Sequence, residues 1–591
     1  MNTNQKIAAL RLAMQAHQLD AYILPSGDPH QSEYVANHWK SRQWISGFSG
    51  SAGTAIITSD HAGLWTDSRY FLTAEEELKG SELILHKQVI PHAPEHIEWL
   101  VTSLRSGSVV GLDGTTFSIA QVKALEHAFH EKGIKINHSI DLINDIWKDR
   151  SPLPENQVFE HDLRFAGVSR IDKINLVREK MKADFHLIST LDDIGWLLNI
   201  RSNDIQCNPV TIAFVVVGQA KTHLFIKQSK VSEALANTLK NDHVELHPYE
   251  NINTFLSELP SGKTIQIHSG STNTSLYNSI AKEQIVAGAN ITMELKAIKN
   301  PTELAHIDNA MLKDGVALTR LYRWLDKTLD ERTVPEVEVA EKLAGFRAEQ
   351  DDYHGESFGA IVGYKENGAI VHYSPHPDTC ATIKKEGILL LDSGGQYLDG
   401  TTDITRTTSL DGKPTAEQKR NFTLVLKGHI ALANMQFPLG TSGIQLDAFA
   451  RQYLWQHGLN YGHGTGHGVG FFLNVHEGPQ GISPSIGRGS QVFQQGMFTS
   501  NEPGFYKTGE YGIRIENLIV TEATSTTAYG TFLKHKTVTL FPIDSKLIDK
   551  TLLDENEKKW LNDYHKEVFE KLSPWLDAAE VGWMRVMCLP C

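Results

Sequence analysis

Two aspartates lie on the two arms of one folded-back segment. Asp392 directly follows the apolar run 388–391, and Asp403 stands 11 residues later among β-branched residues. The pair Asp399-Gly400 between them is typical of a tight turn. Taken alone, each aspartate is more often a turn residue or part of a solvated strand face. Side by side and buried, however, two carboxylates are costly unless cations compensate them.

Two glutamates further along the chain occur in the same kind of setting. Glu502 ends an apolar stretch just before Pro503, and Glu516 lies in the mostly apolar segment 511–520, which predicts a strand. Arg514 lies two residues before Glu516, so we expect both side chains on one side of that strand. A lone strand glutamate usually faces solvent, but four acidic residues beside apolar strand sequence together favour a metal site.

Carboxylate-rich ligation suits hard divalent cations, Mn²⁺ most naturally, and one or two imidazoles can join the ligand set. Four carboxylates with one imidazole meet the needs of two metal ions about 3.5–4 Å apart, bridged by a hydroxide. The sequence therefore predicts a centre for two metal ions.

The segment YGHGTGHGVGFFLNVHEGP (461–479) supplies the candidate imidazoles. His463 and His467 are four residues apart, the spacing with which a helix aims two imidazoles at one zinc ion. Glycine, however, disfavours a helix interior by roughly 1 kcal/mol relative to alanine, and this segment is rich in glycine. Spacing alone leaves open which of these histidines, or His476 after them, binds a metal.

The net charge and the apolar segments limit the kinds of binding partner that we expect. The formal net charge of −14 argues against nucleic acid or an anionic membrane surface as the main partner. The N-terminus predicts an amphipathic helix, with Ile7, Leu10 and Met14 on one stripe, and does not resemble a signal peptide. The longest β-rich apolar run, 212–217, is far too short to cross a membrane. We therefore expect a soluble protein.

The four cysteines form no disulfide framework, which favours a reducing compartment and hence the cytoplasm. The last four residues, Cys588 to Cys591, form a CxxC without a second pair to complete a zinc site, and we expect an inert tail.

The elements that must position these residues fall into a series of units. Segments 1–150 and 158–298 each run from a tryptophan (Trp44, Trp196) through two strands into a helix, which predicts two related α/β domains. The stretch 150–157 carries two prolines and predicts a linker.

A third unit is expected over 299–525, followed by a C-terminal extension over 526–591. Asn300 is a helix cap and Pro301 suits the first turn of a long helix. Beyond that helix, helices alternate with strand pairs, so the fold class is α/β and α+β. The helical stripe that supports this start consists of Leu304, Ile307, Met311, Leu318 and Leu321.

The stretches LLLDSGGQYLDGTTDITRT (389–407), GHGTGHGVGFFLNVHEGP (462–479) and YGIRIEN (511–517) resemble the dinuclear pita-bread metallopeptidases, the group of methionine aminopeptidase, prolidase and aminopeptidase P. The two segments SEYVANHWKSRQWISGFSGSAGTAIIT (32–58) and LWTDSRYF (64–71), with the length of the chain, resemble the long three-domain Xaa-Pro aminopeptidases. The resemblance implies two creatinase-like N-terminal domains ahead of a pita-bread catalytic domain.

The same resemblance implies a ligand set. Asp403 and Glu516 would bridge two Mn²⁺ ions, for which Zn²⁺ or Co²⁺ are substitutes. Asp392 would bind one ion, and His467 and Glu502 would complete the other. The implied activity is release of the N-terminal residue from peptides with proline at position 2, by attack of a hydroxide that bridges the two ions.

Further roles are implied for residues around the metals. Glu502 would shuttle the proton, and His372 would stabilise the oxyanion. His463, His476 and Arg514 would hold the substrate, with Arg514 also orienting the metal ligand two residues after it. The family's common oligomer implies a homodimer.

Alternatives stay open. One is prolidase, which cleaves Xaa-Pro dipeptides with the same ligands, and another is a non-catalytic peptide-binding relative. The literal GxSxG at 355–359 lacks the strand-to-helix setting of a nucleophile elbow, so we reject a serine hydrolase. Trp455 lies nine residues after Leu446, about 180° round a helix at about 100° per residue, so it is covered by other parts of the chain or forms a subunit interface.

Overall fold

The structure is a computed structural model that describes residues 1–88 and 95–591. The chain divides into two compact units. The N-terminal unit comprises residues 1–163 and 168–295, and the C-terminal unit comprises 164–167 and 296–591.

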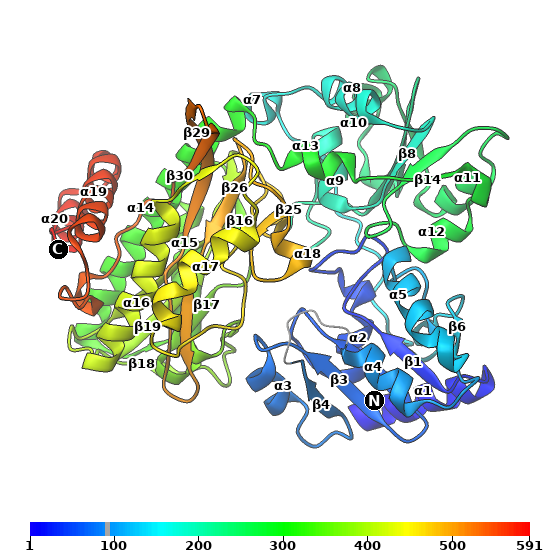
Figure 1. The fold of residues 1–591 in the computed structure, drawn as a ribbon, viewed down its shortest axis with the longest axis horizontal. Coiled ribbons are helices and arrows are strands. Elements are labelled where there is room, and N and C mark those ends of the chain that lie inside the picture. The colour runs from blue at the N-terminus through cyan, green and yellow to red at the C-terminus, as the bar shows by residue number, and fades with distance from the viewer. Residues whose placement is uncertain (89–94) are drawn as a thin grey trace. The chain divides into compact units, whose positions relative to one another are not determined.

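The N-terminal unit contains two six-stranded sheets with the same strand order and the same pattern of parallel and antiparallel pairs (Figure 1). This shared topology confirms the predicted repeat. The first sheet runs β4 (Ile84–Lys87), β3 (Ala62–Thr66), β2 (Thr54–Thr58), β1 (Ala21–Leu24), β5 (Val109–Leu112) and β6 (Lys135–Asn137). The second runs β12 (Val244–His247), β11 (Thr222–Ile226), β10 (Ala213–Gly218), β8 (Phe185–Ile188), β13 (Ile265–Ile267) and β14 (Ile285–Ala287).

Helices pack against these sheets. Helix α1 (Thr3–Ala16) starts at a capping box and buries Ile7, Leu10 and Met14, as its sequence pattern predicts. The other longer helices of the unit are α3 (Phe71–Glu77), α4 (Glu95–Ser103), α5 (Ile119–Phe129), α8 (Arg170–Lys180), α9 (Leu191–Leu198), α10 (Glu233–Asn241) and α11 (Ile252–Ser257).

The first long helix of the C-terminal unit is α14 (Pro301–Glu331), which confirms the predicted long helix that starts at Pro301. Asn300 accepts from the backbone N–H groups of Thr302 and Glu303, and Pro301 occupies the first turn. Three further helices of the unit are α15 (Glu336–Ala348), α16 (Ala416–Ala433) and α17 (Gly443–Trp455).

Several sheets in this unit carry the candidate site. The largest has the order β23 (Gln436–Pro438), β30 (Gly530–Thr537), β29 (Asn517–Thr527), β26 (Phe498–Asn501), β24 (Gly466–Gly468) and β25 (Glu477–Ile482). Two three-stranded sheets are β17 (Ile361–Tyr364), β19 (Ile388–Ser393), β22 (Ile404–Ser409) and β16 (Tyr353–Glu356), β20 (Gly395–Tyr397), β21 (Gly400–Thr401). Strands β27 (Gly504–Lys507) and β28 (Tyr511–Arg514) form a hairpin.

The last helices, α19 (Glu555–Leu572) and α20 (Ala578–Met587), belong to the same core. Leu561 and Met584 are fully buried in one cluster with Ile307 of α14 and Ile513 of β28. The C-terminal extension therefore contributes apolar side chains to the unit that carries the site. Burial raises the pKa of the Cys588 thiol to about 12, which keeps it protonated and unreactive.

The serine of the GxSxG segment supports the rejection of a serine hydrolase. Ser357 is fully buried and donates to the carbonyl of Thr402 at 2.9 Å. The next regular element after it is strand β17, where a nucleophile elbow needs a helix.

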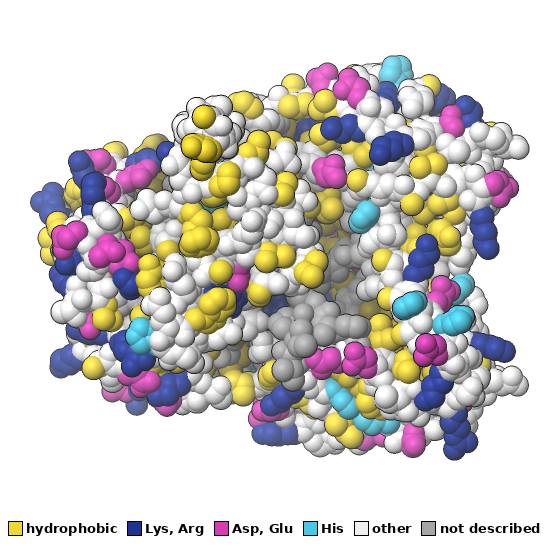
Figure 2. All heavy atoms as spheres, viewed as in Figure 1, with side chains coloured by type: hydrophobic (Ala, Val, Ile, Leu, Met, Phe, Trp, Pro, Cys, Tyr) yellow, Lys and Arg dark blue, Asp and Glu magenta, His cyan; other side chains and the backbone are white. Residues whose placement is uncertain are grey.

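Surface features agree with the composition. Figure 2 shows acidic and basic side chains interspersed over the visible face. Among the described residues, each helix is too short or too polar to cross a membrane.

Candidate metal centre

The predicted acidic residues lie at strand ends that meet in the C-terminal unit. Asp392 is in β19, opposite Thr405 of the antiparallel neighbour β22, and Asp403 directly precedes β22. Glu502 directly follows β26. Strands β19 and β22 belong to one sheet and β26 to another, so the site brings together residues of two sheets that are more than 100 positions apart in the sequence, such as Asp403 and Glu516.

Three of the predicted ligands form the centre of the group. Asp403, His467 and Glu516 each offer a ligand atom, and these atoms lie within 4.8 Å of one another. His467 Nε2 is 3.4 Å from Asp403 Oδ2 and 3.6 Å from Glu502 Oε1. A single imidazole nitrogen therefore faces two carboxylates.

The other ring nitrogen of His467 fixes the tautomer. Nδ1 lies 2.9 Å from the carbonyl oxygen of Gly468, which can only accept, so Nδ1 carries the proton. Nε2 is then the ring nitrogen that faces the acidic residues, which is the orientation of a metal-ligating histidine.

Glycine is required on both sides of His467. A Cβ on Gly466 would lie 2.0 Å from the carbonyl oxygen of Ser500, and one on Gly468 would lie 2.2 Å from that of Glu477. These close approaches hold the three-residue strand β24 between its neighbours, so the glycines of HGTGHG serve backbone packing.

The strand predicted over 511–520 is interrupted at Glu516. Strand β28 ends at Arg514 and β29 begins at Asn517. At the break, the backbone N–H of Glu516 donates to the carbonyl of Thr405 at 3.1 Å. The prediction of one continuous strand is therefore wrong, because this crossing hydrogen bond replaces a sheet partner. The prediction that Arg514 and Glu516 face one side is confirmed, because both side chains contact the hydroxyl of Thr405.

Burial and mutual repulsion shape the electrostatics of the group. Asp403 and Glu516 are fully buried, and burial raises the pKa of each well above its ordinary value. The charges of Asp392 and Glu502 raise both pKa values further. Such carboxylates ionise together only when cations replace their protons.

Two carboxylate oxygens at the site suit metal ligation. Asp392 Oδ1 and Glu516 Oε1 are buried, and neither has a hydrogen-bond partner among the described residues. Buried oxygens normally accept a hydrogen bond or bind a cation. These two are therefore suited to bind a hard divalent cation. The donor set of four carboxylates and one imidazole therefore fits divalent metal ions.

Arg514 is the positively charged side chain that contacts the acidic residues of this site. Its Nη2 donates to Asp392 Oδ2 at 2.6 Å, and its Nε donates to Thr405 Oγ1 at 3.1 Å. The Thr405 hydroxyl in turn donates to Glu516 Oε2 at 2.7 Å. Arg514 thus orients Asp392 directly and Glu516 through Thr405, a residue that the sequence analysis missed.

His463 contacts the candidate ligands only through other side chains. Its Nε2 is 2.8 Å from Tyr506 Oη, and Nδ1 is 2.7 Å from the carbonyl of Gly464. Tyr506 also accepts from Arg514 Nη1 at 2.6 Å. A hydrogen-bonded series therefore joins Asp392, Arg514, Tyr506 and His463. Tyr506 lies in a hairpin strand whose sequence carried no motif, so the sequence analysis missed it.

His476 packs edge-on against His467, with ring centroids 4.3 Å apart. The next residue, Glu477, is buried and accepts from Lys299 Nζ at 2.5 Å, while Lys296 Nζ lies 3.5 Å from its other oxygen. The lysines stand at the start of the unit, ahead of α14, and anchor the first residue of β25, which directly follows His476. The two lysines, three residues apart before a helix cap, gave no sign of this role in the sequence.

His372 lies in the turn after the 3₁₀ helix η6 (Lys365–Ala369) and is half-buried. The carbonyl of its neighbour Val371 is 3.4 Å from Arg514 Nη2. This contact brings the turn to the same arginine that holds Asp392.

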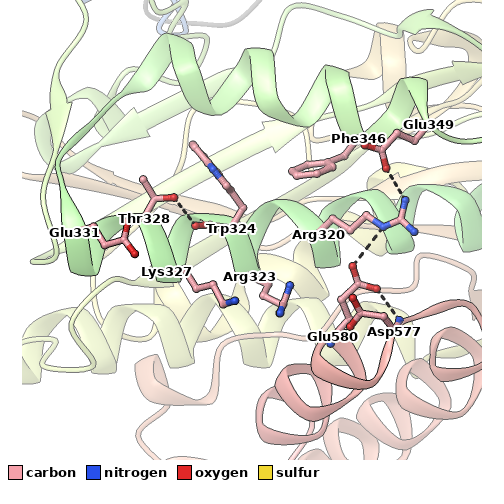
Figure 3. Close-up of a pocket in the computed structure, with 10 residues that line it drawn as sticks. All are labelled: Arg320, Arg323, Trp324, Lys327, Thr328, Glu331, Phe346, Glu349, Asp577 and Glu580. Carbon is pink, nitrogen blue, oxygen red and sulfur yellow. Dashed lines mark hydrogen bonds and ion pairs between the residues drawn. The ribbon is translucent and has the colours of Figure 1, made fainter.

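The C-terminal unit also has a pocket of about 600 Å³ away from these residues (Figure 3). It is formed by α14, α15 and α20, and within it Arg320 pairs with Glu349 and Glu580. None of its lining residues is a predicted site residue. The lining residues are Arg320, Arg323, Trp324, Lys327, Thr328, Glu331, Phe346, Glu349, Asp577 and Glu580.

Fold and site together define a metallopeptidase. Residues 305–523 match the model of metallopeptidase family M24, and 531–591 match the C-terminal region of M24 peptidases. Residues 6–146 and 149–303 each match a creatinase/prolidase N-terminal domain.

Relatives that match over the whole chain identify the kind of metallopeptidase. The chain is 42% identical to a probable Xaa-Pro aminopeptidase P of Laccaria bicolor, covering 100% of this chain and 94% of the relative. It is 40% identical to Xaa-Pro aminopeptidase 1 of Dictyostelium discoideum, covering 99% and 96%. The solved X-prolyl aminopeptidase of Caenorhabditis elegans, described as a cytosolic enzyme with a di-nuclear active site, superposes with a TM-score of 0.95 at 34% identity, over 100% of both chains. The chain belongs to the Xaa-Pro aminopeptidase family of M24 metallopeptidases.

Proposed function

We propose that this chain is an aminopeptidase that releases the N-terminal residue from peptides with proline at position 2, at a centre of two divalent metal ions. The observation that carries the proposal is the convergence of Asp403, His467 and Glu516 within 4.8 Å, with Glu502 beside His467. The full-length similarity to Xaa-Pro aminopeptidases supports the substrate class.

In this proposal five residues hold the metals. Asp392, Asp403, His467, Glu502 and Glu516 would hold the two ions, with Asp403, His467 and Glu516 nearest one another. When bound, the ions lower the pKa of a water molecule and polarise the scissile carbonyl. Mn²⁺ is the proposed ion because the donor set is mostly carboxylate, and Zn²⁺ or Co²⁺ are substitutes.

The surrounding side chains have proposed roles in proton transfer and binding. Glu502 accepts the proton of the attacking water and passes it to the proline nitrogen, which needs a proton to leave. His372 donates to the carbonyl oxygen as negative charge develops on it. His463 and His476 hold the peptide. Arg514 keeps Asp392 in place, and its contacts to protein groups favour positioning over direct substrate binding.

Proline at position 2 constrains the site. The scissile bond to proline is a tertiary amide without an N–H, so the site must bind the substrate without a donor at that nitrogen. Recognition then rests on the carbonyl oxygen, the free amino terminus and the proline ring.

Prolidase activity on Xaa-Pro dipeptides is the second candidate, since it needs the same ligands. The whole-chain similarity to Xaa-Pro aminopeptidases, including both N-terminal domains, favours the aminopeptidase. A non-catalytic relative is disfavoured because all five candidate ligand residues are present in the sequence.

The proposed domain boundaries are 1–150, 158–298, 299–525 and 526–591. Family-model matches at 6–146, 149–303, 305–523 and 531–591 support them. A cytoplasmic location is proposed from the low cysteine content, four in 591 residues, and from the cytosolic Caenorhabditis elegans relative.

A homodimer is proposed through the exposed face of α17. Trp455 is 49% exposed and Phe449 on the same helix is 44% exposed, which is unusual for large apolar side chains. Light scattering of a Trp455→Arg, Phe449→Arg variant tests this proposal. A monomer is expected, and a variant that keeps the wild-type mass would contradict it.

The test of function uses metal-stripped protein and the tripeptide Arg-Pro-Pro. We expect free arginine only when Mn²⁺ is added, and none from an Asp403→Asn variant. Cleavage of the dipeptide Ala-Pro without cleavage of the tripeptide would establish prolidase instead. Metal binding without cleavage of either peptide would refute both activities.

A further inference from the structure

A second group of metal-ligating side chains lies in the N-terminal unit, where edge strand β12 runs parallel to β11. His223 of β11 stands opposite Glu245 of β12, and Phe225 stands opposite His247. Side chains two residues apart on a strand face the same way, so His223, Glu245 and His247 share one face of the sheet.

The three donor groups lie close enough together to bind one metal ion. His223 Nδ1 is 3.1 Å from His247 Nε2 and 3.6 Å from Glu245 Oε2, and all three donors lie within 4.8 Å of one another. Ligand atoms at about 2.0–2.2 Å from a tetrahedral Zn²⁺ are roughly 3.3–3.6 Å apart. The two distances from His223 Nδ1 are therefore close to those around a Zn²⁺ ion, and the third pair needs a shift of about 1 Å at most.

Neighbouring side chains hold the donors in this arrangement. Lys221 forms an ion pair with Glu245 Oε1, which leaves Oε2 directed at His223. Phe255 of α11 lies 4.8 Å from the His223 ring and 5.9 Å from the His247 ring, measured between centroids, and forms an apolar wall. The side chains of His223 and Glu245 are 14% and 41% exposed, so an ion has access from solvent.

The repeat in this unit supplies an internal comparison. In the first sheet, parallel strands β3 and β4 occupy the equivalent positions, and His86 corresponds by register to His247. His61 and His86 approach to 3.1 Å between their Nε2 atoms. The position of Glu245 is taken by Ile84, and Trp65 stacks on His86 at 4.0 Å. A hydrogen bond between two imidazoles accounts for that pair, whereas the second sheet adds a carboxylate.

We propose that His223, Glu245 and His247 bind one Zn²⁺ ion, with the fourth position open to water. Two imidazoles and one carboxylate suit a borderline cation better than the hard ions favoured by a carboxylate-rich centre. The ion joins β12 to β11 through side chains, so it strengthens the attachment of a strand that has only one neighbour.

The test counts zinc in full-length protein. Metal-stripped protein is equilibrated with micromolar Zn²⁺, freed of unbound ion by gel filtration, and analysed by mass spectrometry of the metal. We expect His247→Ala and His223→Ala to bind one Zn²⁺ per chain fewer than the wild type. His86→Ala, the matched control in the first sheet, is expected to keep the wild-type count. Equal zinc in the wild type and His247→Ala would overturn the proposal.

A second measurement separates this site from the acidic centre. In an Asp403→Asn background, Cu²⁺ replaces Zn²⁺ as a spectroscopic probe, and we expect an electron paramagnetic resonance signal with hyperfine splitting from two imidazole nitrogens. Adding His247→Ala is expected to remove that signal while circular dichroism stays native. A two-nitrogen signal that survives His247→Ala would contradict the assignment. Peptidase activity is not the readout, so failure here is distinct from failure of the proposed function.

Discussion

The two metal-ligating groups of this chain differ in both composition and depth. The acidic centre combines carboxylates with one imidazole, and Asp403 and Glu516 are almost fully buried. The group on β11 and β12 combines two imidazoles with one carboxylate at a sheet edge, where Glu245 is partly exposed. Buried carboxylates repel one another, so metal binding and folding are coupled at the acidic centre. At the edge, solvent screens the charges and the coupling is weak.

The partners of the two groups differ in the same way. Arg514 is buried and makes ordered hydrogen bonds to Asp392, Tyr506 and Thr405. Lys221 makes one exposed ion pair with Glu245. A substitution in the acidic centre should therefore change function or folding, whereas its counterpart at the edge should leave both nearly unchanged.

The largest expected effect is on activity. Asp403→Asn removes a carboxylate at the centre of the acidic group, and we expect kcat/KM for Arg-Pro-Pro to fall on the order of a thousandfold or more, equivalent to about 4 kcal/mol. Glu245→Gln is the control at the edge and should keep activity within about twofold of the wild type. An Asp403→Asn enzyme with near-native activity would contradict the assignment.

The second-largest expected effect is on the free energy of unfolding. Glu477→Gln leaves the buried Lys296 and Lys299 facing an amide in place of a carboxylate, and we expect a loss of about 3 kcal/mol or more in the free energy of unfolding. Urea denaturation in the presence of a chelator measures this. Glu245→Gln, which removes an exposed lysine partner, should lose less than about 1 kcal/mol. Equal losses would show that burial does not distinguish the two regions.

A smaller effect is expected for the hydrogen-bonded series beyond the ligands. Tyr506→Phe removes the hydroxyl between Arg514 and His463, and we expect roughly a tenfold loss in kcat/KM. Tyr511→Phe is the matched control, because its hydroxyl in the next strand accepts from Asn421. If both variants keep native activity, Tyr506 has no positioning role.

The smallest expected effect is a change in the pH dependence of stability. The pKa values of Asp403 and Glu516 are raised in the folded metal-free protein, mainly by burial. Above the ordinary carboxyl pKa of about 4, the folded state therefore holds protons that the unfolded chain has released, and its stability falls as pH rises through the raised values. Mn²⁺ replaces those protons.

Thermal denaturation between pH 5 and 8 tests this sign. The midpoint of metal-free wild type should fall more with rising pH than that of the Mn²⁺ form or of metal-free Asp403→Asn. A metal-free midpoint that rises more steeply with pH than that of the Mn²⁺ form would show that the carboxylates are not held protonated.

The sequence predicted much of the fold. Local signals sufficed for α1, with its apolar stripe, and for α14, with its Asn300 cap and Pro301, because capping and periodicity act within one or two turns. The repeated N-terminal domains were also visible, since the same series of a tryptophan, two apolar runs and a helix occurs twice along the chain.

The site was less visible where it depends on distant pairing. The break at Glu516 arises from a hydrogen bond to Thr405, which is 111 residues away in sequence. The Tyr506 and Thr405 contacts, and the pairing of Lys299 with Glu477, come from tertiary packing that no local pattern encodes. Residue types and family motifs predicted the candidate ligands, and the structure adds what orients them.

The most direct test of the central claim is to count Mn²⁺ and measure activity in the same samples. Metal-stripped wild type is titrated with Mn²⁺, and bound ions per chain are compared with the rate of arginine release from Arg-Pro-Pro. The account predicts two Mn²⁺ per chain and full activity at saturation, with loss of both in Asp403→Asn. Full activity in metal-stripped protein, or an Asp403→Asn variant that binds two ions and cleaves the peptide normally, would contradict it.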